Sequence, residues 1–178
     1  MRTTIRSLVC AVALAGPAWA GTESHDLQVR ATVPQKCLIS TSALNFGPYD
    51  PISVNASADL NGTAQATVTC TRSATAVTIT LGPGSNASGS TRRMQGTARG
   101  GFLAYEIYQP SATSPGAPCS FPGTTVWGTS GPAAFTPTGT AEWGGSAAKQ
   151  FSICATIPRG QDVPADDYQD SVVTTVDF

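Results

Sequence analysis

Residues 168–178 read Y-Q-D-S-V-V-T-T-V-D-F, so apolar or β-branched side chains alternate with polar ones. This period of two predicts a β-strand that carries Val172, Thr174, Val176 and Phe178 on one face. We expect no later strand to cover the outer edge of this one. Because a bare apolar edge is a template for another chain, the strand either lies inside a sheet or receives a strand from a partner.

A second alternating segment precedes the first cysteine of the mature chain. Residues 25–34 read H-D-L-Q-V-R-A-T-V-P, which places Leu27, Val29, Ala31 and Val33 on one face. Pro34 ends this predicted strand because proline has no N–H for a ladder. The segment is either the first strand of a complete sandwich or a strand donated to another chain. The pattern alone does not separate insertion into its own domain from exchange between chains.

Residues 1–20 carry the features of a secretory signal peptide. Arg2 and Arg6 precede an apolar run, and Ala18-Trp19-Ala20 forms an A-x-A cleavage site. The mature chain is therefore predicted to start near Gly21. The apolar run is too short to span a bilayer and no other long apolar stretch follows, so no stable membrane anchor is expected.

The cysteines and the charge narrow the class of protein further. Four of the 5 cysteines follow the signal segment, namely Cys37, Cys70, Cys119 and Cys154, whereas Cys10 lies within it. In an exported chain they predict two disulfides, and three pairings are possible. With a formal net charge of −1 and 12% charged residues, the chain is not suited to binding nucleic acid.

The chain as a whole reads as all-β, since 18 glycines and 13 prolines interrupt it and no window keeps a helical period. Strands are expected at residues 26–33, 38–46, 63–70, 76–81, 102–108, 149–156 and 168–178. Their spacing is typical of an antiparallel sandwich with Greek-key connections. Residues 82–101 are expected to be a mobile or hairpin-like surface connection. Residues 109–145 form a long connection, which Cys119 is expected to strap down.

Candidate sites for catalysis or ligand binding are few. His25 is the one histidine, so neither a histidine triad nor a zinc site is expected, and we expect no cofactor. The acidic stretch with Asp162, Asp166, Asp167 and Asp170 does not match a calcium loop, and a solvated turn is the preferred interpretation. No acid/base constellation indicates an enzyme.

Two sets of side chains offer binding hypotheses. Arg92, Arg93 and Arg99 would suit an acidic partner such as a polysaccharide, but a solvated loop is the preferred interpretation. Trp127 and Trp143 would suit stacking on sugar rings, but core or loop-anchoring roles are preferred.

An ordered set of motifs resembles the spore coat protein U domain family, which includes the Csu-type pilus subunits of the archaic chaperone-usher pathway. The motifs are F-G-P-Y-D-P at 46–51, R-M at 93–94, L-A-Y-E-I-Y at 103–108, W-G at 127–128 and I-P-R-G-Q at 157–161, together with Cys70, Pro164, Tyr168 and Asp170. The chain departs from the family at Arg159, where a small residue is usual, and at Asp166, where a glycine is usual. Cys154 stands where an aromatic residue is expected.

The resemblance implies an incomplete immunoglobulin-like Greek-key β-sandwich that a donor strand completes. It implies a Cys37–Cys70 bridge, and a Cys119–Cys154 bridge would explain the long loop together with the unusual Cys154. The implied domains are a signal peptide (residues 1–20), a donor extension (residues 21–34) and a pilin-type domain (residues 35–178).

The implied function is that of a non-enzymatic subunit of a secreted surface pilus. Its implied partners are neighbouring pilus subunits, a periplasmic chaperone and an outer-membrane usher. Leu27, Val29, Ala31 and Val33 would form the donor strand, and Val172, Thr174, Val176 and Phe178 would edge the acceptor groove. The alternatives are a carbohydrate-binding adhesin and a coat protein that self-associates without chaperone and usher.

Overall fold

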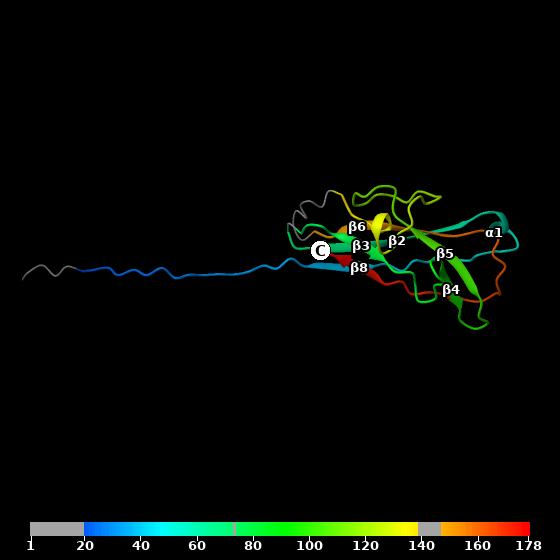
Figure 1. Ribbon diagram of the computed structural model, residues 1–178, viewed down its shortest axis with the longest axis horizontal. Helices are drawn as coiled ribbons and strands as arrows, with labels where there is room; N and C mark the ends of the chain where they lie inside the picture. The colour runs from blue at the N-terminus through cyan, green and yellow to red at the C-terminus, as the bar shows by residue number, and fades with distance from the viewer. Residues whose placement is uncertain (1–19, 73, 139–146) are drawn as a thin grey trace, which may run out of the picture. The chain divides into compact units, whose positions relative to one another are not determined.

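Figure 1 shows a computed structural model of the chain, which describes residues 20–72, 74–138 and 147–178. The signal segment up to residue 19 and Trp143 lie outside the described residues. The chain divides into two units, Met1–Thr32 and Val33–Phe178. The described residues of the first unit form neither helix nor strand. Leu27 and Val29 there are 86% and 82% exposed, respectively.

The second unit is almost entirely β-structure, which confirms the predicted fold class. The helices are α1 (Val54–Ser57) and a 3-10 turn, η1 (Gly131–Ala133). The strands are β1 (Cys37–Thr41), β2 (Leu60–Cys70), β3 (Thr78–Leu81), β4 (Arg92–Gly96), β5 (Phe102–Tyr108), β6 (Lys149–Ile157), β7 (Tyr168–Gln169) and β8 (Thr174–Asp177). In the part of the chain that the structure describes, no helix is long and apolar enough to cross a membrane.

The strands form two antiparallel sheets. Six strands pair in the order β1-β2-β6-β5-β4-β7, and β3 pairs with β8. Alternation decides which side chains turn inward, as β5 shows with buried Leu103, Tyr105 and Ile107. Trp127, Phe135 and Phe151 are fully buried. The ring centroids of Trp127 and Phe135 are 4.8 Å apart, and those of Phe135 and Phe151 are 5.4 Å apart.

Two disulfides join distant parts of the sequence. Cys37 and Cys70 are paired in register and link β1 to β2. Cys119 and Cys154 link the long connection after β5 to β6, with their Cα atoms 5.5 Å apart. The connection is also held by backbone bonds, including Gly116 N to Gln150 O at 2.8 Å.

Four expected segments differ in the structure. The strand expected at residues 38–46 ends at Thr41. Residues 26–33 form no strand, because a strand requires a neighbouring ladder to satisfy its backbone groups. Residues 82–101, expected as a surface connection, contain β4, which pairs with β5 and β7. The single strand expected at 168–178 is two strands, since β7 pairs with β4 and β8 pairs with β3. The chain therefore passes from the six-stranded sheet to the two-stranded sheet between β7 and β8.

Candidate functional site

A groove of about 380 Å³ runs between two stretches of chain that are distant in sequence. One wall comes from residues 41–46, after β1, and the other from residues 168–174, between β7 and β8. The floor is largely apolar and consists of Ala64, Leu81, Met94, Tyr105, Ile107 and Ile153. We call this site the groove.

Both outer edges of the six-stranded sheet border the groove. β1 is the first strand in the sheet order and contributes Thr41, while β7 is the last and contributes Tyr168 and Gln169. A strand laid in the groove would therefore lie between the two free edges of one sheet. Its backbone would find ladder partners there, as in β-strand addition.

The C-terminal wall directs alternate backbone groups toward the groove. Gly82 N donates to Val173 O at 2.9 Å and Ser85 N donates to Ser171 O at 3.0 Å, so these two residues face the β3 side. In an antiparallel ladder successive residues face opposite sides. The N–H and C=O groups of Val172 and Thr174 consequently face the groove, where a further strand can pair with them.

The predicted edge residues separate into three groups. Val172 and Thr174 line the groove. Val176 is half-buried against the core. Phe178 lies beyond the end of β8, is 50% exposed and does not line the groove.

Asp170 fastens the C-terminal wall to the floor. Its carboxylate accepts hydrogen bonds from the Tyr105 hydroxyl at 2.8 Å and from the backbone N–H of Asn86 at 3.1 Å. Burial, followed by the bond to Asp170, raises the pKa of Tyr105 well above its usual value. Gly84, at φ +92°, makes room, because a Cβ there would stand 2.1 Å from the Asp170 carboxylate. Tyr105 therefore stays neutral and donates the bond that holds the wall.

A second hollow of about 640 Å³ adjoins the groove, between residues 44–51 and 163–168. The two share Leu44, Phe46, Met94 and Tyr168 as lining residues. Phe46 stands against Tyr105 with ring centroids 6.2 Å apart. Gly62 permits this, since a Cβ there would lie 2.8 Å from the Phe46 ring. The F-G-P-Y-D-P motif thus shapes the wall that the groove and the hollow share.

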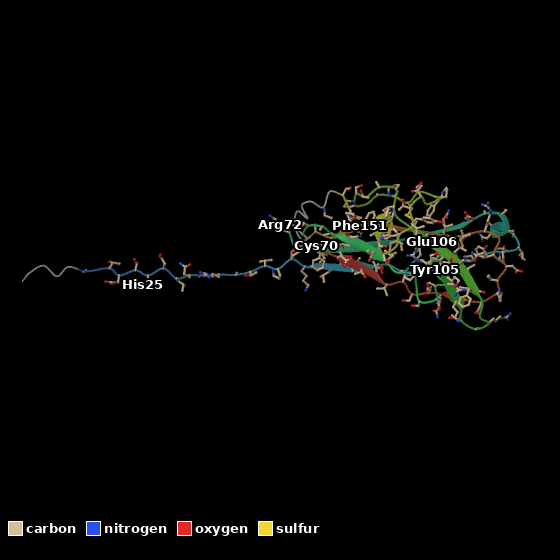
Figure 2. The ribbon with its side chains drawn as sticks, viewed as in Figure 1. His25, Cys70, Arg72, Tyr105, Glu106 and Phe151 are labelled. Carbon is tan, nitrogen blue, oxygen red and sulfur yellow. A yellow bond between two sulfur atoms is a disulfide. The ribbon has the colours of Figure 1, made fainter. Side chains whose placement is uncertain are left out.

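Arg92 is a structural residue, so its interpretation as a solvated loop cation is wrong. It is 3% exposed, forms an ion pair with Glu106, and donates to the carbonyls of Gly82 (2.8 Å) and Trp127 (2.7 Å). Figure 2 labels Glu106 beside Tyr105 on β5. Arg93 stacks over the Phe102 ring at 4.0 Å, whereas Arg99 is exposed.

Trp127 has the anchoring role expected of it. It is fully buried, and its indole N–H donates to Ile79 O at 2.9 Å. A buried ring with its one donor satisfied offers no face to a sugar. Trp127 therefore does not support the adhesin hypothesis. Trp143 lies outside the described residues.

Asp166, in the acidic stretch, holds a neighbouring loop in place. Asp166 accepts backbone N–H bonds from Ala98 at 3.0 Å and Arg99 at 2.6 Å, and these bonds lower the pKa of its carboxyl. Asp166 does not adopt the positive φ that the usual glycine suggested. Among the described residues, no group of three or more His, Cys, Asp or Glu is placed to hold a metal ion. His25 is exposed.

Sequence reasoning missed the floor of the groove and its Tyr105–Asp170 bond. The sequence predicted the strand at residues 102–108, but not that Tyr105 and Ile107 would line a groove. Sequence reasoning also did not identify residues 41–46 as a wall of the groove, although Phe46 belongs to a recognised motif.

Known protein families, sequences and solved structures include proteins that are similar to this chain. The sequence model described as Spore Coat Protein U domain matches residues 23–175. Protein U of Myxococcus xanthus is 36% identical over 193 residues, covering 100% of this chain and 98% of that protein. A solved chaperone–tip adhesion subunit pre-assembly complex, from the archaic chaperone-usher Csu pili of Acinetobacter baumannii, contains a chain 21% identical to this one. That match has a TM-score of 0.48 and covers 83% of this chain and 41% of that chain.

Proposed function

Because this chain belongs to the Spore Coat Protein U domain family, we propose that it is a non-enzymatic structural subunit of a secreted surface pilus. Subunits would polymerise by donating residues 27–33 to the groove of a neighbouring copy. A periplasmic chaperone would hold the groove before assembly, and an outer-membrane usher would pass the subunit to the cell surface.

The groove between the two free sheet edges carries this proposal. Its C-terminal wall, residues 168–174, has seven residues, as does the donor stripe 27–33, and seven residues in a strand extend about 23 Å. The stripe has the alternation that such a site requires, with apolar side chains for the floor and polar ones for solvent. Length and pattern therefore match between donor and acceptor.

Binding of the donor stripe in the groove of a neighbouring copy would be energetically favourable. Leu27, Val29 and Val33 are all more than 80% exposed outside a groove. Burying each contributes about 1.5–3 kcal/mol, and ladder bonds with residues such as Val172 add to this. Backbone groups of the wall, such as those of Val172 and Thr174, would gain ladder partners from the donated strand.

Deletion of residues 22–33 tests the proposal. We expect a folded subunit that is recovered with its chaperone and can receive a strand, but cannot pass one on, so electron microscopy should show no fibres. Fibres formed by this variant would refute the proposal. If the intact chain assembles in the absence of chaperone and usher, the coat-protein alternative is favoured.

A pair of double substitutions provides a matched control. Val29→Asp with Val33→Asp places two charges on the apolar face and should abolish fibres. Gln28→Asp with Thr32→Asp places the same two charges on the opposite face and should preserve them. Equal loss in both variants would indicate that added charge, and not the donor face, is responsible.

A further inference from the structure

We propose that the two ends of the domain are docking surfaces of opposite charge, so that the acidic end of one copy contacts the basic end of a second copy. This contact is separate from strand donation, because it lies on the outer ends of the domain and not in the groove. The inference rests on the proposed function for the order of the copies, and it follows from where the charged side chains lie.

The acidic end of the domain lies around α1, where β2 begins and β6 ends. Among the described residues, five aspartates lie at this end, against two arginines, Arg99 and Arg159. The aspartates are Asp50, Asp59, Asp162, Asp166 and Asp167. Arg159 is already paired with Asp59, at 3.8 Å between Nη1 and Oδ1. This end therefore keeps an excess of negative charge.

Two of these aspartates are available to a partner. Asp162 and Asp167 are exposed, and within the described residues neither carboxylate forms an ion pair. Asp167 holds the neighbouring loop through its backbone, since its carbonyl accepts the Thr97 N–H at 3.0 Å. The carboxylate of Asp167 is thus left for a cation from outside the domain.

The basic end lies at the opposite end of the same strands, where β1 begins and β2 ends. Lys36 precedes β1, Arg72 follows β2 and Lys149 begins β6, while Asp177 is the one acidic residue described at this end. Lys36 and Arg72 are exposed, and neither forms an ion pair with the described residues. Figure 2 labels Arg72 at this end, and Figure 1 places α1 at the far end of the domain.

The other charged side chains described in the domain lie between the two ends and make contacts within it. These contacts are Arg92 with Glu106, Arg93 with Phe102 and Asp170 with Tyr105. The unpaired charge is therefore sorted by position, negative at one end and positive at the other. Surfaces of opposite sign on one chain favour head-to-tail contact between copies of that chain.

Strand donation would bring the two ends together. Lys36 follows Val33 by three residue steps, which span at most about 11 Å. The groove reaches the acidic end at residues 44–46, which also line the hollow that Asp167 borders. A stripe that leaves a neighbouring groove at this end places Lys36 beside the acidic end. A stripe that leaves at the other end would instead bring two basic ends together.

Such charge pairs act mainly on the rate of association and on its salt dependence. Each exposed ion pair contributes little to affinity. Complementary ends nevertheless steer two copies toward each other and disfavour the wrong orientation. Because the screening length is about 10 Å at 0.1 M salt, steering should weaken as salt is added.

Charge reversal in the full mature chain tests this contact. Lys36→Glu with Arg72→Glu reverses the basic end, and Asp162→Lys with Asp167→Lys reverses the acidic end. All four side chains are exposed, so the fold should be retained, as circular dichroism can check. A chain with all four changes has both ends reversed, and its ends are complementary again. Light scattering at about 20 mM and about 300 mM salt follows the growth of fibres.

A second pair of variants controls for net charge. Lys36→Gln with Arg72→Gln removes two positive charges from the basic end. Ser40→Glu with Gln65→Glu changes the net charge equally, at exposed positions on the outer face of β1 and β2. Growth should slow about threefold in the first variant and stay unchanged in the control.

We expect reversal of either end to slow fibre growth about tenfold at the lower salt, and by much less at the higher salt. The chain with all four changes should grow within about twofold of the wild-type rate. The inference is overturned if reversal of one end leaves growth unchanged, or if the chain with all four changes grows as slowly as either reversed variant. Equal slowing in the net-charge control also overturns it.

The donor-face variant Val29→Asp with Val33→Asp separates this inference from the proposed function. If that variant still associates while the reversed ends abolish association, the proposed function fails and the docking of the ends stands. If that variant forms no fibres while the reversed ends have no effect, only the docking of the ends fails. A wild-type chain that does not associate at either salt concentration overturns both.

Discussion

The core around Trp127, Phe135 and Phe151 and the floor of the groove differ in what covers them. The first, which we call the covered core, is closed by the long connection after β5 and its disulfide to β6. The groove floor has apolar residues of the same kind, from β3, β5 and β6, but remains open between its two walls. The domain thus combines a covered core with an open groove.

The largest effect is expected from Trp127→Ala, which breaks the covered core. The substitution removes a fully buried ring and one of two donors to the Ile79 carbonyl, which keeps its bond from the Phe135 N–H. Loss of about 3–5 kcal/mol in the free energy of unfolding should follow, as measured by urea denaturation. A change below about 1 kcal/mol would show that this core is not closed.

The two disulfides sharpen the comparison because their loops are nearly equal, with separations of 33 and 35 residues. Replacing either pair with serines should cost about 2–4 kcal/mol in urea denaturation. Only the Cys37/Cys70 variant should also weaken binding of a peptide of residues 22–34, since Cys37 begins the strand that leads into the groove wall. Equal weakening by both variants would contradict this division.

Arg92→Met tests the polar link between the two regions. The carbonyls of Gly82 and Trp127 would lose their donor, and Glu106 would lose its ion-pair partner while keeping the bond from the Ile107 N–H. Because Glu106 keeps some contact with water, we expect a loss of about 2 kcal/mol in the free energy of unfolding, below the range for fully buried pairs. Arg93→Met serves as the control and should cost about 1 kcal/mol, since it loses a stacking contact on Phe102 and one hydrogen bond to Asn86 O.

Phe46→Ala tests the groove. The ring is half-buried while the groove is empty, so stability should fall by about 1 kcal/mol. Affinity for the 22–34 peptide, measured by calorimetry, should fall about tenfold, since the substitution removes part of the shared wall. The reverse pattern, large instability with unchanged affinity, would place Phe46 in the covered core.

The smallest effect concerns pH. Backbone bonds lower the pKa of folded Asp166 below its ordinary 3.8, so the unfolded state takes up the proton first as pH falls. The stability from this carboxylate is therefore present above the unfolded pKa and is lost as pH falls through the folded pKa. Asp166→Asn should flatten the acid limb of a stability curve recorded from about pH 2 to 6. An unchanged curve would contradict the assignment.

Sequence alone determined the elements whose signal is local. The strand at residues 102–108 was predicted at its observed bounds because strict alternation fixes both its period and its inward face. The all-β class and the stripe at 27–33 follow from the same period of two. The stretch at 92–96 was missed as a strand because its composition, with adjacent arginines near glycines and serines, is that of a loop. Burial of Arg92 against Glu106 on the next strand makes it one.

Tertiary structure alone decided where the sheet stays open. Alternation in residues 168–178 showed which side chains turn inward, but not that β7 and β8 belong to different sheets. The passage between them is held by Asp170, whose partners Tyr105 and Asn86 lie far away in sequence. A period of two assigns faces along one strand, whereas the free edge of a sheet depends on which strands meet, and that is set by contacts between distant residues.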